Sequence, residues 1–238
     1  MLEAAELCED LVSFFQPKLL AGRRVLITAG PTFEAIDPVR GITNLSSGKM
    51  GFAIARAARE AGAEVTLVAG PVHLPTPRGV RRHNVMTAQQ MFDAVVPQAT
   101  QHDVFIATAA VADWRPVSSA EHKIKKEGTK SVPSFDLTEN PDILAAVAGL
   151  SAPPYCVGFA AESERLLEHA RAKMLRKGIP LIVGNLGPAT FGRDDNALVL
   201  IDAQADRALP PDGSRADKLT LARALMQDIA QRLQAVTP

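Results

Sequence analysis

The chain carries an apolar strand, Arg24-Val25-Leu26-Ile27-Thr28-Ala29, and beyond Gly30-Pro31-Thr32 a loop of small residues that opens an apolar helix, Asn44-Leu45-Ser46-Ser47-Gly48-Lys49-Met50-Gly51. A strand that leads through a loop into a glycine-marked helix start is typical of phosphate sites in α/β proteins. The helix N-terminus offers unpaired N–H groups and the positive end of a dipole to an anion, and glycines let a ligand approach the backbone. This stretch therefore predicts a nucleotide or phosphate site.

The spacing in this region differs from both common phosphate motifs. A P-loop requires Gly-x-x-x-x-Gly-Lys-Ser/Thr, but Thr43 stands in place of its first glycine and Met50 in place of its hydroxyl. Of the Rossmann fingerprint only the final Gly-x-x-Gly remains, displaced from the strand by the insert 32–43. We expect Ser46 or Ser47 to cap the helix. A second interpretation gives the glycines only a role in close helix–sheet packing.

Composition limits the class of protein. The 238 residues are 47% hydrophobic, enough for a soluble domain with a sizeable core, and no run approaches the ~20 apolar residues of a membrane helix. Lys and Arg number 26, as do Asp and Glu, so no net charge recruits nucleic acid or a membrane. Cys8 and Cys156 form no Cys-x-x-Cys pair; they indicate a cytoplasmic location and are expected to be small core residues.

Strand and helix patterns alternate along the chain. The predicted strands are 25–29, 64–69, 80–85, 102–107, 155–159, 180–183 and 196–201, and the helices are 48–61, 88–99, one opened by Asn140-Pro141-Asp142, 163–177 and 216–234. This rhythm predicts an α/β fold of the Rossmann-like, doubly wound kind, with a mostly parallel sheet, helices on both faces and a C-terminal β-hairpin and helix extension. Residues 1–20 are expected to be a linker-like helix, and residues 21–238 a single nucleotide-binding domain.

A run of small residues, Ala107-Thr108-Ala109-Ala110, leaves the end of the predicted strand 102–107. Ligands bind at the carboxyl ends of strands in open parallel sheets, so this run leaves room there for a planar ring or a ribose. Asp113 supplies a carboxylate close by, although it could equally be a solvated loop charge.

Two groups of lysines are candidates for anion binding. Lys123-Ile124-Lys125-Lys126 suggests a phosphate-seeking flap, with a solvated charged face as the alternative. Lys173 and Lys177 continue the apolar stripe of Leu166 and Ala170 on one face of the predicted helix 163–177. They form either a phosphate-binding pair or two snorkelling stems.

The sequence lacks the characteristic residues of several other enzyme classes. The five histidines form no close i, i+4 pair and no Cys partners them, which disfavours zinc, and no Gly-x-Ser-x-Gly elbow occurs. Tyr155 is followed four positions on by Phe159 rather than by the lysine of short-chain dehydrogenases. An NAD(P)-binding oxidoreductase of Rossmann type and a non-catalytic nucleotide-binding module remain as alternatives.

An ordered set of motifs resembles phosphopantothenoylcysteine synthetase, the ligase half of the bacterial bifunctional phosphopantothenoylcysteine decarboxylase/phosphopantothenate–cysteine ligase. The motifs are Thr28-Ala29-Gly30-Pro31-Thr32, Asp37-Pro38-Val39-Arg40, Asn44–Gly51, Ala109–Asp113, Lys123–Lys126, Asn140-Pro141-Asp142-Ile143, Gly158-Phe159-Ala160-Ala161-Glu162 and Asp195-Asn196-Ala197. They run from Gly22 to Gln234 in the order of the family. Leu45 and Trp114 depart from it, standing where histidine and tyrosine are common.

The resemblance implies a CTP-dependent ligation in coenzyme A biosynthesis. The carboxylate of phosphopantothenate would become an acyl-cytidylate with release of pyrophosphate, and the amine of L-cysteine would then displace CMP. Mg²⁺ or a similar divalent cation is implied, with ligands that the sequence does not identify. Residues 21–238 would be the ligase domain of a homodimer, fused to or associated with a decarboxylase, and residues 1–20 match the linker between the two halves.

The resemblance also assigns roles to individual residues. The nucleotide contacts fall on Ala107, Thr108, Ala109, Asp113, Lys123, Pro141, Asp142, Ile143, Leu144, Phe159, Lys173 and Lys177. Lys123 would neutralise the triphosphate from a closing flap, and Asn44 would engage the acyl-cytidylate. Arg40 and Ala110 complete the implied substrate contacts, with Arg40 as a ligand for the phosphate of phosphopantothenate. The segment 40–44 and the C-terminal strands would lie at the dimer interface.

Overall fold

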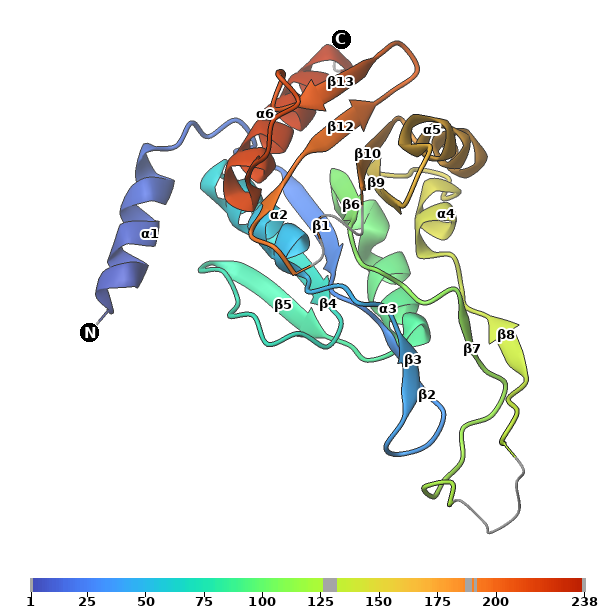
Figure 1. The fold of residues 1–238 in the computed structure, drawn as a ribbon. Coiled ribbons are helices and arrows are strands. Elements are labelled where there is room, and N and C mark those ends of the chain that lie inside the picture. The colour runs from blue at the N-terminus through green and yellow to red at the C-terminus, as the bar shows by residue number, and fades with distance from the viewer. Residues whose placement is uncertain (1, 126–131, 187–189, 191, 237–238) are drawn as a thin grey trace.

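The structure is a computed structural model, and it describes residues 2–125, 132–186, 190 and 192–236. Its central sheet has the order β13-β12-β10-β9-β6-β1-β4-β5 in the described residues (Figure 1). These strands are β1 (Arg24–Ala29), β4 (Glu64–Ala69), β5 (Val80–Asn84), β6 (Val104–Ala107), β9 (Tyr155–Glu162), β10 (Leu181–Leu186), β12 (Leu198–Ile201) and β13 (Asp206–Leu209). The six strands from β5 to β10 run parallel, while β12 and β13 form an antiparallel hairpin at the edge.

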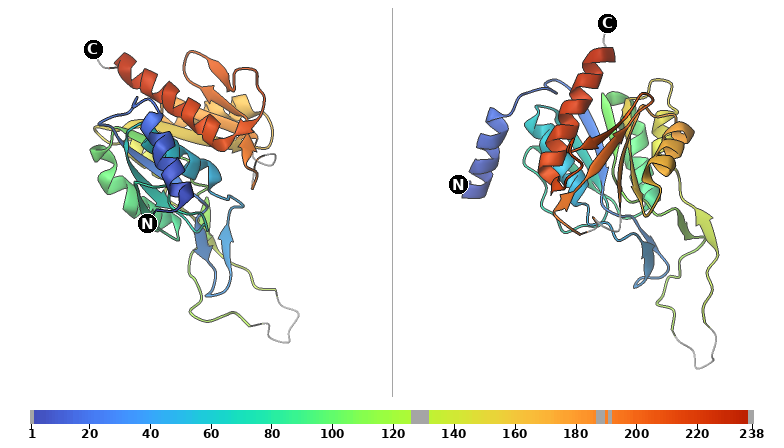
Figure 2. Two further views of the ribbon diagram at one scale, coloured as in Figure 1. Left: turned by 90° about the vertical axis from the view of Figure 1, so that its left-hand side faces the viewer. Right: turned by 45° about the horizontal axis from the view of Figure 1, so that its top comes forward.

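The helices cover both faces of this sheet (Figures 1 and 2). On one face, α2 (Lys49–Glu60) and α6 (Lys218–Val236) share a core with the inward side chains of β1, β4 and β10. On the other, α3 (Ala88–Val95), the 3-10 turn η1 (Val96–Gln101), α4 (Ile143–Ala148) and α5 (Leu166–Lys177) form the second core. Strands buried on both faces need near-continuous apolar runs, and Val25, Leu26 and Ile27 are completely buried. The predicted fold class is confirmed.

Some element boundaries differ from the sequence-based expectation. The helix predicted over 88–99 ends at Val95, where the chain continues as a 3-10 turn with Pro97 in its first turn. The helix predicted over 163–177 begins at Leu166, because Arg165 at its N-cap has a left-handed backbone with φ of 48°. The strand predicted over 196–201 is divided into β11 (Asp195–Asn196), which pairs with β14 (Ala216–Asp217), and β12.

Two hairpins project from the carboxyl edge of the sheet (Figure 1). The insert 32–43 folds as the hairpin of β2 (Phe33–Ala35) and β3 (Gly41–Thr43), and β7 (Trp114–Pro116) pairs with β8 (Leu137–Glu139). The backbone N–H of Ala120 donates to the carbonyl of Ile36 at 2.9 Å, which joins the two hairpins. Lys126, the last residue of the predicted lysine flap, lies outside the described residues.

The N-terminal helix α1 (Ala4–Phe15) lies beside the body of the protein (Figure 2). Its acidic side faces the body, where Arg78 contacts Glu6 and Asp10 at 3.0 Å each, and its apolar residues Phe14 and Phe15 are 75% and 78% exposed. No helix among the described residues is long and apolar enough to cross a membrane. The division of the chain after residue 20 stays a prediction.

The two cysteines lie in different surroundings. Cys156 on β9 is buried in the core as expected, and burial raises the pKa of its thiol to about 12. Cys8 is exposed on α1, so the expectation that it is a core residue is wrong. The reason is that α1 turns its charged side, rather than its apolar side, toward the body.

Candidate functional site

A cavity of about 750 Å³ opens at the carboxyl ends of β1, β6, β9 and β10. This is the edge at which open parallel sheets bind ligands. Its lining comprises Thr28, the loop and helix start Asn44–Gly51, the segment Ala107–Trp114, the segment Glu139–Leu144, Phe159, Ala161, Glu162, Lys173, Arg176, Lys177, Asn185, Thr190, Asn196 and Lys218.

The floor of the cavity is formed by the segments that follow β1 and β6. They continue the parallel pairing of the strands, since the N–H of Ala110 donates to the carbonyl of Gly30 at 2.9 Å and that of Ala112 to the hydroxyl of Thr32 at 3.0 Å. Asn44 lies in the loop that connects β3 to α2, and its Nδ2 donates to the carbonyl of Ala110 at 3.0 Å. The amide of Asn44 is thereby fixed over the small-residue run.

The start of α2 forms one wall, and Gly48 is its N-cap in the left-handed conformation, with φ of 75°. The expectation that Ser46 or Ser47 caps the helix is wrong: in this described segment no side chain caps α2, and Ser46 Oγ instead accepts from the N–H of Gly48 at 3.3 Å. A Cβ atom on Gly51 would lie 2.5 Å from Thr108 Oγ1. The packing interpretation therefore applies to Gly51, while the loop also lines the cavity.

Two lysines of α5 form the opposite wall. Lys173 Nζ donates to the carbonyl of Phe159 at 2.8 Å, and Lys177 forms an ion pair with Asp142. Burial lowers the pKa of both ammonium groups, and the Asp113 carboxylate acts on both in the opposite direction. Asp113 is exposed and lines the same cavity as the two lysines. Both side chains run inward from α5. Lys173 reaches the carbonyl of Phe159 on β9, and the side chain of Lys177 is only 14% exposed.

The segment between β8 and α4 joins these walls. Asp142 is the N-cap of α4 and accepts from the N–H of Ala145 at 3.0 Å, so the helix predicted to open at Asn140-Pro141-Asp142 has Ile143 as its first residue. Asn140 Nδ2 donates to the carbonyl of Ala112 at 2.8 Å. Behind the cap, Ile143 and its neighbour Leu144 are buried against the sheet.

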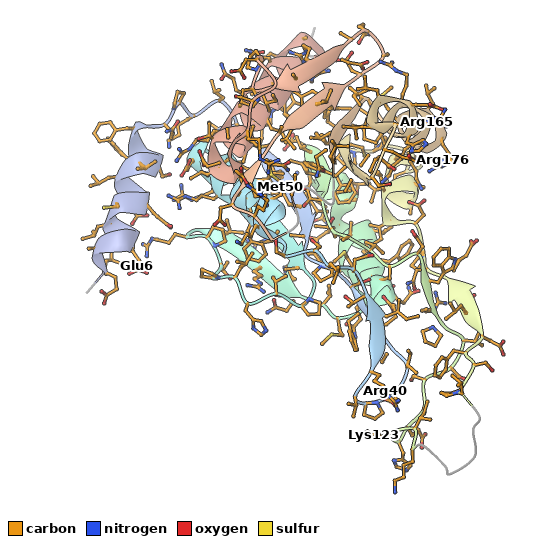
Figure 3. The ribbon with its side chains drawn as sticks, viewed as in Figure 1. Glu6, Arg40, Met50, Lys123, Arg165 and Arg176 are labelled. Atoms are coloured by element: carbon orange, nitrogen blue, oxygen red, sulfur yellow. The ribbon has the colours of Figure 1, made fainter. Side chains whose placement is uncertain are left out.

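Arg40 and Lys123 lie on the two projecting hairpins and do not line the cavity. Figure 3 shows them near one another, on the side of the molecule away from Met50 of the cavity wall. The side chain of Asp37 is buried between them: it accepts from Arg40 Nε at 3.0 Å and from the N–H of Ile124 at 3.1 Å. Burial alone would raise the pKa of Asp37, but the Arg40 guanidinium and three backbone N–H groups hold it well below its usual range.

The structure thus brings most predicted site residues into one cavity. These are Asn44, Ala107, Thr108, Ala109, Ala110, Asp113, Pro141, Asp142, Ile143, Leu144, Phe159, Lys173 and Lys177. Sequence reasoning missed Arg176, Asn185, Thr190 and Lys218. One signal in the sequence could have identified Lys218. A cation in the first turn of a helix lies near the positive end of the helix dipole, which is an unfavourable position.

Comparison of the chain with known proteins identifies its family. The model of the family described as the DNA/pantothenate metabolism flavoprotein C-terminal domain matches residues 20–233. The chain belongs to this family. Similar members include the Coenzyme A biosynthesis bifunctional protein CoaBC of Vibrio cholerae serotype O1, 49% identical over 98% of this chain, and that of Escherichia coli, 45% identical over 98%. The chain spans 58% of the length of each.

A solved structure agrees with this assignment. The crystal structure of the C-terminal domain of CoaBC superposes with a TM-score of 0.73 at 36% sequence identity, covering 92% of this chain and 99% of that domain. The DNA/pantothenate metabolism flavoprotein fold therefore extends over nearly all of the present chain. The resemblance inferred from the motifs is confirmed at the level of the family.

Proposed function

We propose that the chain is a CTP-dependent phosphopantothenate–cysteine ligase, which forms phosphopantothenoylcysteine through an acyl-cytidylate in coenzyme A biosynthesis. One observation carries the proposal: a single cavity unites Asn44, the small-residue floor and the lysine pair of α5. Membership of a family whose curated members are named for coenzyme A biosynthesis supports it.

In the first step, a carboxylate oxygen of phosphopantothenate attacks the α-phosphorus of CTP. The bond between the α- and β-phosphates breaks, and pyrophosphate leaves with the electron pair. The protein supplies position and charge rather than a nucleophile. Ala107–Ala109, Asp113, Pro141–Leu144 and Phe159 would hold the nucleoside, while Lys173 and Lys177 would face its phosphates.

In the second step, the amine of L-cysteine attacks the acyl carbon, the bond to the phosphate oxygen breaks, CMP leaves and the amine gives up a proton. Asn44 would hold the mixed anhydride for this attack, with Ala110 beside it. Its amide is already fixed over the floor by the bonds to the carbonyls of Ala110 and Val111, at 3.0 and 3.2 Å.

A divalent cation such as Mg²⁺ fits these residues as a companion of the triphosphate. Among the described residues no group of three His, Cys, Asp or Glu side chains could hold a metal alone. Mg²⁺ usually needs only one or two carboxylates together with substrate phosphates, and Asp113, Asp142 and Glu162 line the cavity. Bound there, the ion would neutralise charge on the triphosphate.

The hairpin residues would act by approaching the cavity. Lys123 would close over the triphosphate, and Arg40 would bind the phosphate of phosphopantothenate. The protein would work as a homodimer, with the segment 40–44 and the C-terminal strands at the interface, and in association with a decarboxylase in the cytoplasm. A Rossmann-type oxidoreductase is disfavoured, because the β2–β3 hairpin occupies the position of the first turn of the dinucleotide fingerprint.

The test is release of pyrophosphate from CTP in the presence of phosphopantothenate and Mg²⁺, with and without cysteine. We expect release in both cases and CMP together with the amide product only with cysteine. ATP, GTP and UTP in parallel measure base selectivity, and NADH and NADPH binding tests the oxidoreductase. Absence of release with every nucleoside triphosphate would overturn the ligase proposal.

A further inference from the structure

Asn140 joins two segments that line the cavity. Its Nδ2 donates to the carbonyl of Ala112 at 2.8 Å, and its backbone N–H donates to the carbonyl of Asp113 at 2.8 Å. One residue of the segment before α4 thereby holds two successive carbonyls of the segment that follows β6. The motif Asn140-Pro141-Asp142 is thus attached to the floor of the cavity through its first residue.

A third hydrogen bond extends from Asn140 to the hairpin of β7 and β8. Its Oδ1 accepts from Arg115 Nη1 at 3.1 Å, and the same Nη1 donates to the carbonyl of Glu139 at 2.6 Å. Arg115 belongs to β7, and Lys123 lies in the connection from β7 to β8 (Figure 1). The base of the hairpin that carries Lys123 is therefore bonded to Asn140 at the point where this hairpin meets the cavity.

The amide side chain of Asn140 satisfies both of its neighbours, which a carboxylate would not. It uses an N–H donor toward the carbonyl of Ala112 and an oxygen acceptor toward Arg115, whereas an ionised carboxylate offers acceptors alone. The next residue, Pro141, has no backbone N–H that could replace the donor. The junction between floor and hairpin therefore depends on the amide.

The position of Asn140 also orients the start of α4. Pro141 disfavours a helical conformation for the residue before it, and Asp142 caps α4 and forms an ion pair with Lys177. The bonds of Asn140 thus connect three parts of the site: the floor at Asp113, the start of α4 and the base of the β7–β8 hairpin. In a reaction that depends on positioning, a displacement of about 1 Å can cost about a hundredfold in rate.

We propose that Asn140 is a positioning residue of the first half-reaction, with Arg115 as its partner. This inference rests on the proposed ligase function. Asn140 acts through its neighbours: it holds Asp113 and the start of α4 toward the nucleotide, and it fixes the direction in which the β7–β8 hairpin presents Lys123. Attack on the α-phosphorus requires both parts to be aligned, whereas attack of cysteine on the acyl carbon depends on Asn44.

The test measures the two half-reactions separately in Asn140→Asp. This variant keeps an acceptor for Arg115, removes the donor to Ala112 and turns a carboxylate toward that carbonyl. We expect single-turnover pyrophosphate release at saturating CTP to slow by about ten- to a hundredfold, and conversion of synthetic acyl-cytidylate with cysteine to stay within about twofold. Asn84→Asp is the matched control, because Asn84 Oδ1 also accepts from an arginine, Arg82, at 2.7 Å, outside the cavity.

The single tryptophan of the chain gives a readout of the junction that does not depend on turnover. Trp114 lies between Asp113 and Arg115, pairs with Glu139, lines the cavity and is 55% exposed. CTP should protect the fluorescence of Trp114 from quenching by acrylamide in the wild-type protein. This protection should be lost in Asn140→Asp and in Arg115→Met, and retained in the control.

Equal slowing of both half-reactions would show that Asn140 only stabilises the fold, and would overturn the positioning role; unchanged rates in a folded variant would do the same. If Asn140→Asp does not fold, Arg115→Met removes the same junction from the side of the hairpin and decides by the same two rates. Absence of pyrophosphate release by the wild-type protein overturns the ligase proposal, and loss or retention of Trp114 protection then decides the role of Asn140. A wild-type protein that neither turns over nor binds CTP overturns both proposals.

Discussion

The cavity and the two hairpins beside it are built in different ways. The cavity lies on the ends of completely buried parallel strands, and backbone hydrogen bonds fix its floor. The hairpins consist of three-residue strands, and buried Asp37 joins them through Arg40 and Ile124. Asn44 and the α5 lysines thus line the cavity, whereas Arg40 and Lys123 lie on the projecting hairpins. In the proposed reaction the cavity would hold the nucleotide and the mixed anhydride, and the hairpins would bring Arg40 and Lys123 to the phosphate groups.

The largest effect is expected from Lys123→Gln. Removal of this charge should slow pyrophosphate release by about a hundred- to a thousandfold, because charge stabilisation in the transition state is lost. CTP affinity, measured by calorimetry, should fall by less than about tenfold, because the cavity provides most of the binding contacts. Arg81→Gln, which removes one exposed charge from β5 outside the cavity, is the charge-matched control. Equal losses in affinity and in rate would show that the hairpin binds CTP as strongly as the cavity does.

Asn44→Asp should divide the two half-reactions. The substitution removes the Nδ2 donor that holds residue 44 to Ala110 and adds a negative charge close to the phosphate. We expect acyl-cytidylate to accumulate and product formation to slow by about ten- to a hundredfold, which mass spectrometry and CMP release measure together. Asn84→Asp on the exposed edge strand β5 is the matched control. A variant that stops before pyrophosphate release contradicts the role given to Asn44.

The pH dependence of CTP affinity should reveal the α5 lysines. Their pKa values are lowered by burial, so as pH rises their charge is lost earlier than that of an exposed lysine, whose pKa is about 10.4. We therefore expect CTP affinity to fall by about tenfold on an alkaline limb below that value. Lys173→Arg should move the limb to higher pH. A limb that stays in place in this variant would assign it to another group.

The smallest effect is expected from Asp37→Asn, which weakens the junction of the hairpins. Amide exchange at residues 122–125 should accelerate and turnover should fall a few-fold, with CTP affinity unchanged. Because the folded-state pKa of Asp37 is depressed, its contribution is present above the unfolded value of about 3.9 and is lost as pH falls through the lower folded value. Wild-type exchange protection at these residues should therefore persist at pH values near 5. Slow exchange in the Asn variant would show that Asp37 does not join the hairpins.

Much of the body could be predicted from local pattern. Apolar runs such as Val25–Ala29 gave the parallel strands, and the rule that ligands bind at their carboxyl ends brought Ala107–Ala110 and Asp113 into the cavity. The spacing of Lys173 and Lys177 on one helix face was enough to place both on its inner side.

The remaining features depend on contacts that are distant in sequence. Nothing local to Asp37 indicates that it accepts an N–H from Ile124, 87 positions further on. Gly48 takes the cap position that was expected for a serine because the loop must turn in a left-handed conformation beside Gly30. Lys218 was missed for the same reason, since its partners Thr190 and Arg193 precede it by 28 and 25 positions.

Gly51 allows the start of α2 to pack closely against the ends of the central strands. A methyl group there would meet both Ala29 Cβ and Thr108 Oγ1 at 2.5 Å, so the helix that carries the loop rests on the two central strands with only a hydrogen atom between them. A Cβ atom at position 51 would push the start of α2 away from Ala29 and Thr108. The Asn44 amide would then move away from the carbonyls of Ala110 and Val111. The absence of a side chain at Gly51 therefore determines how closely the start of α2 approaches the floor of the cavity.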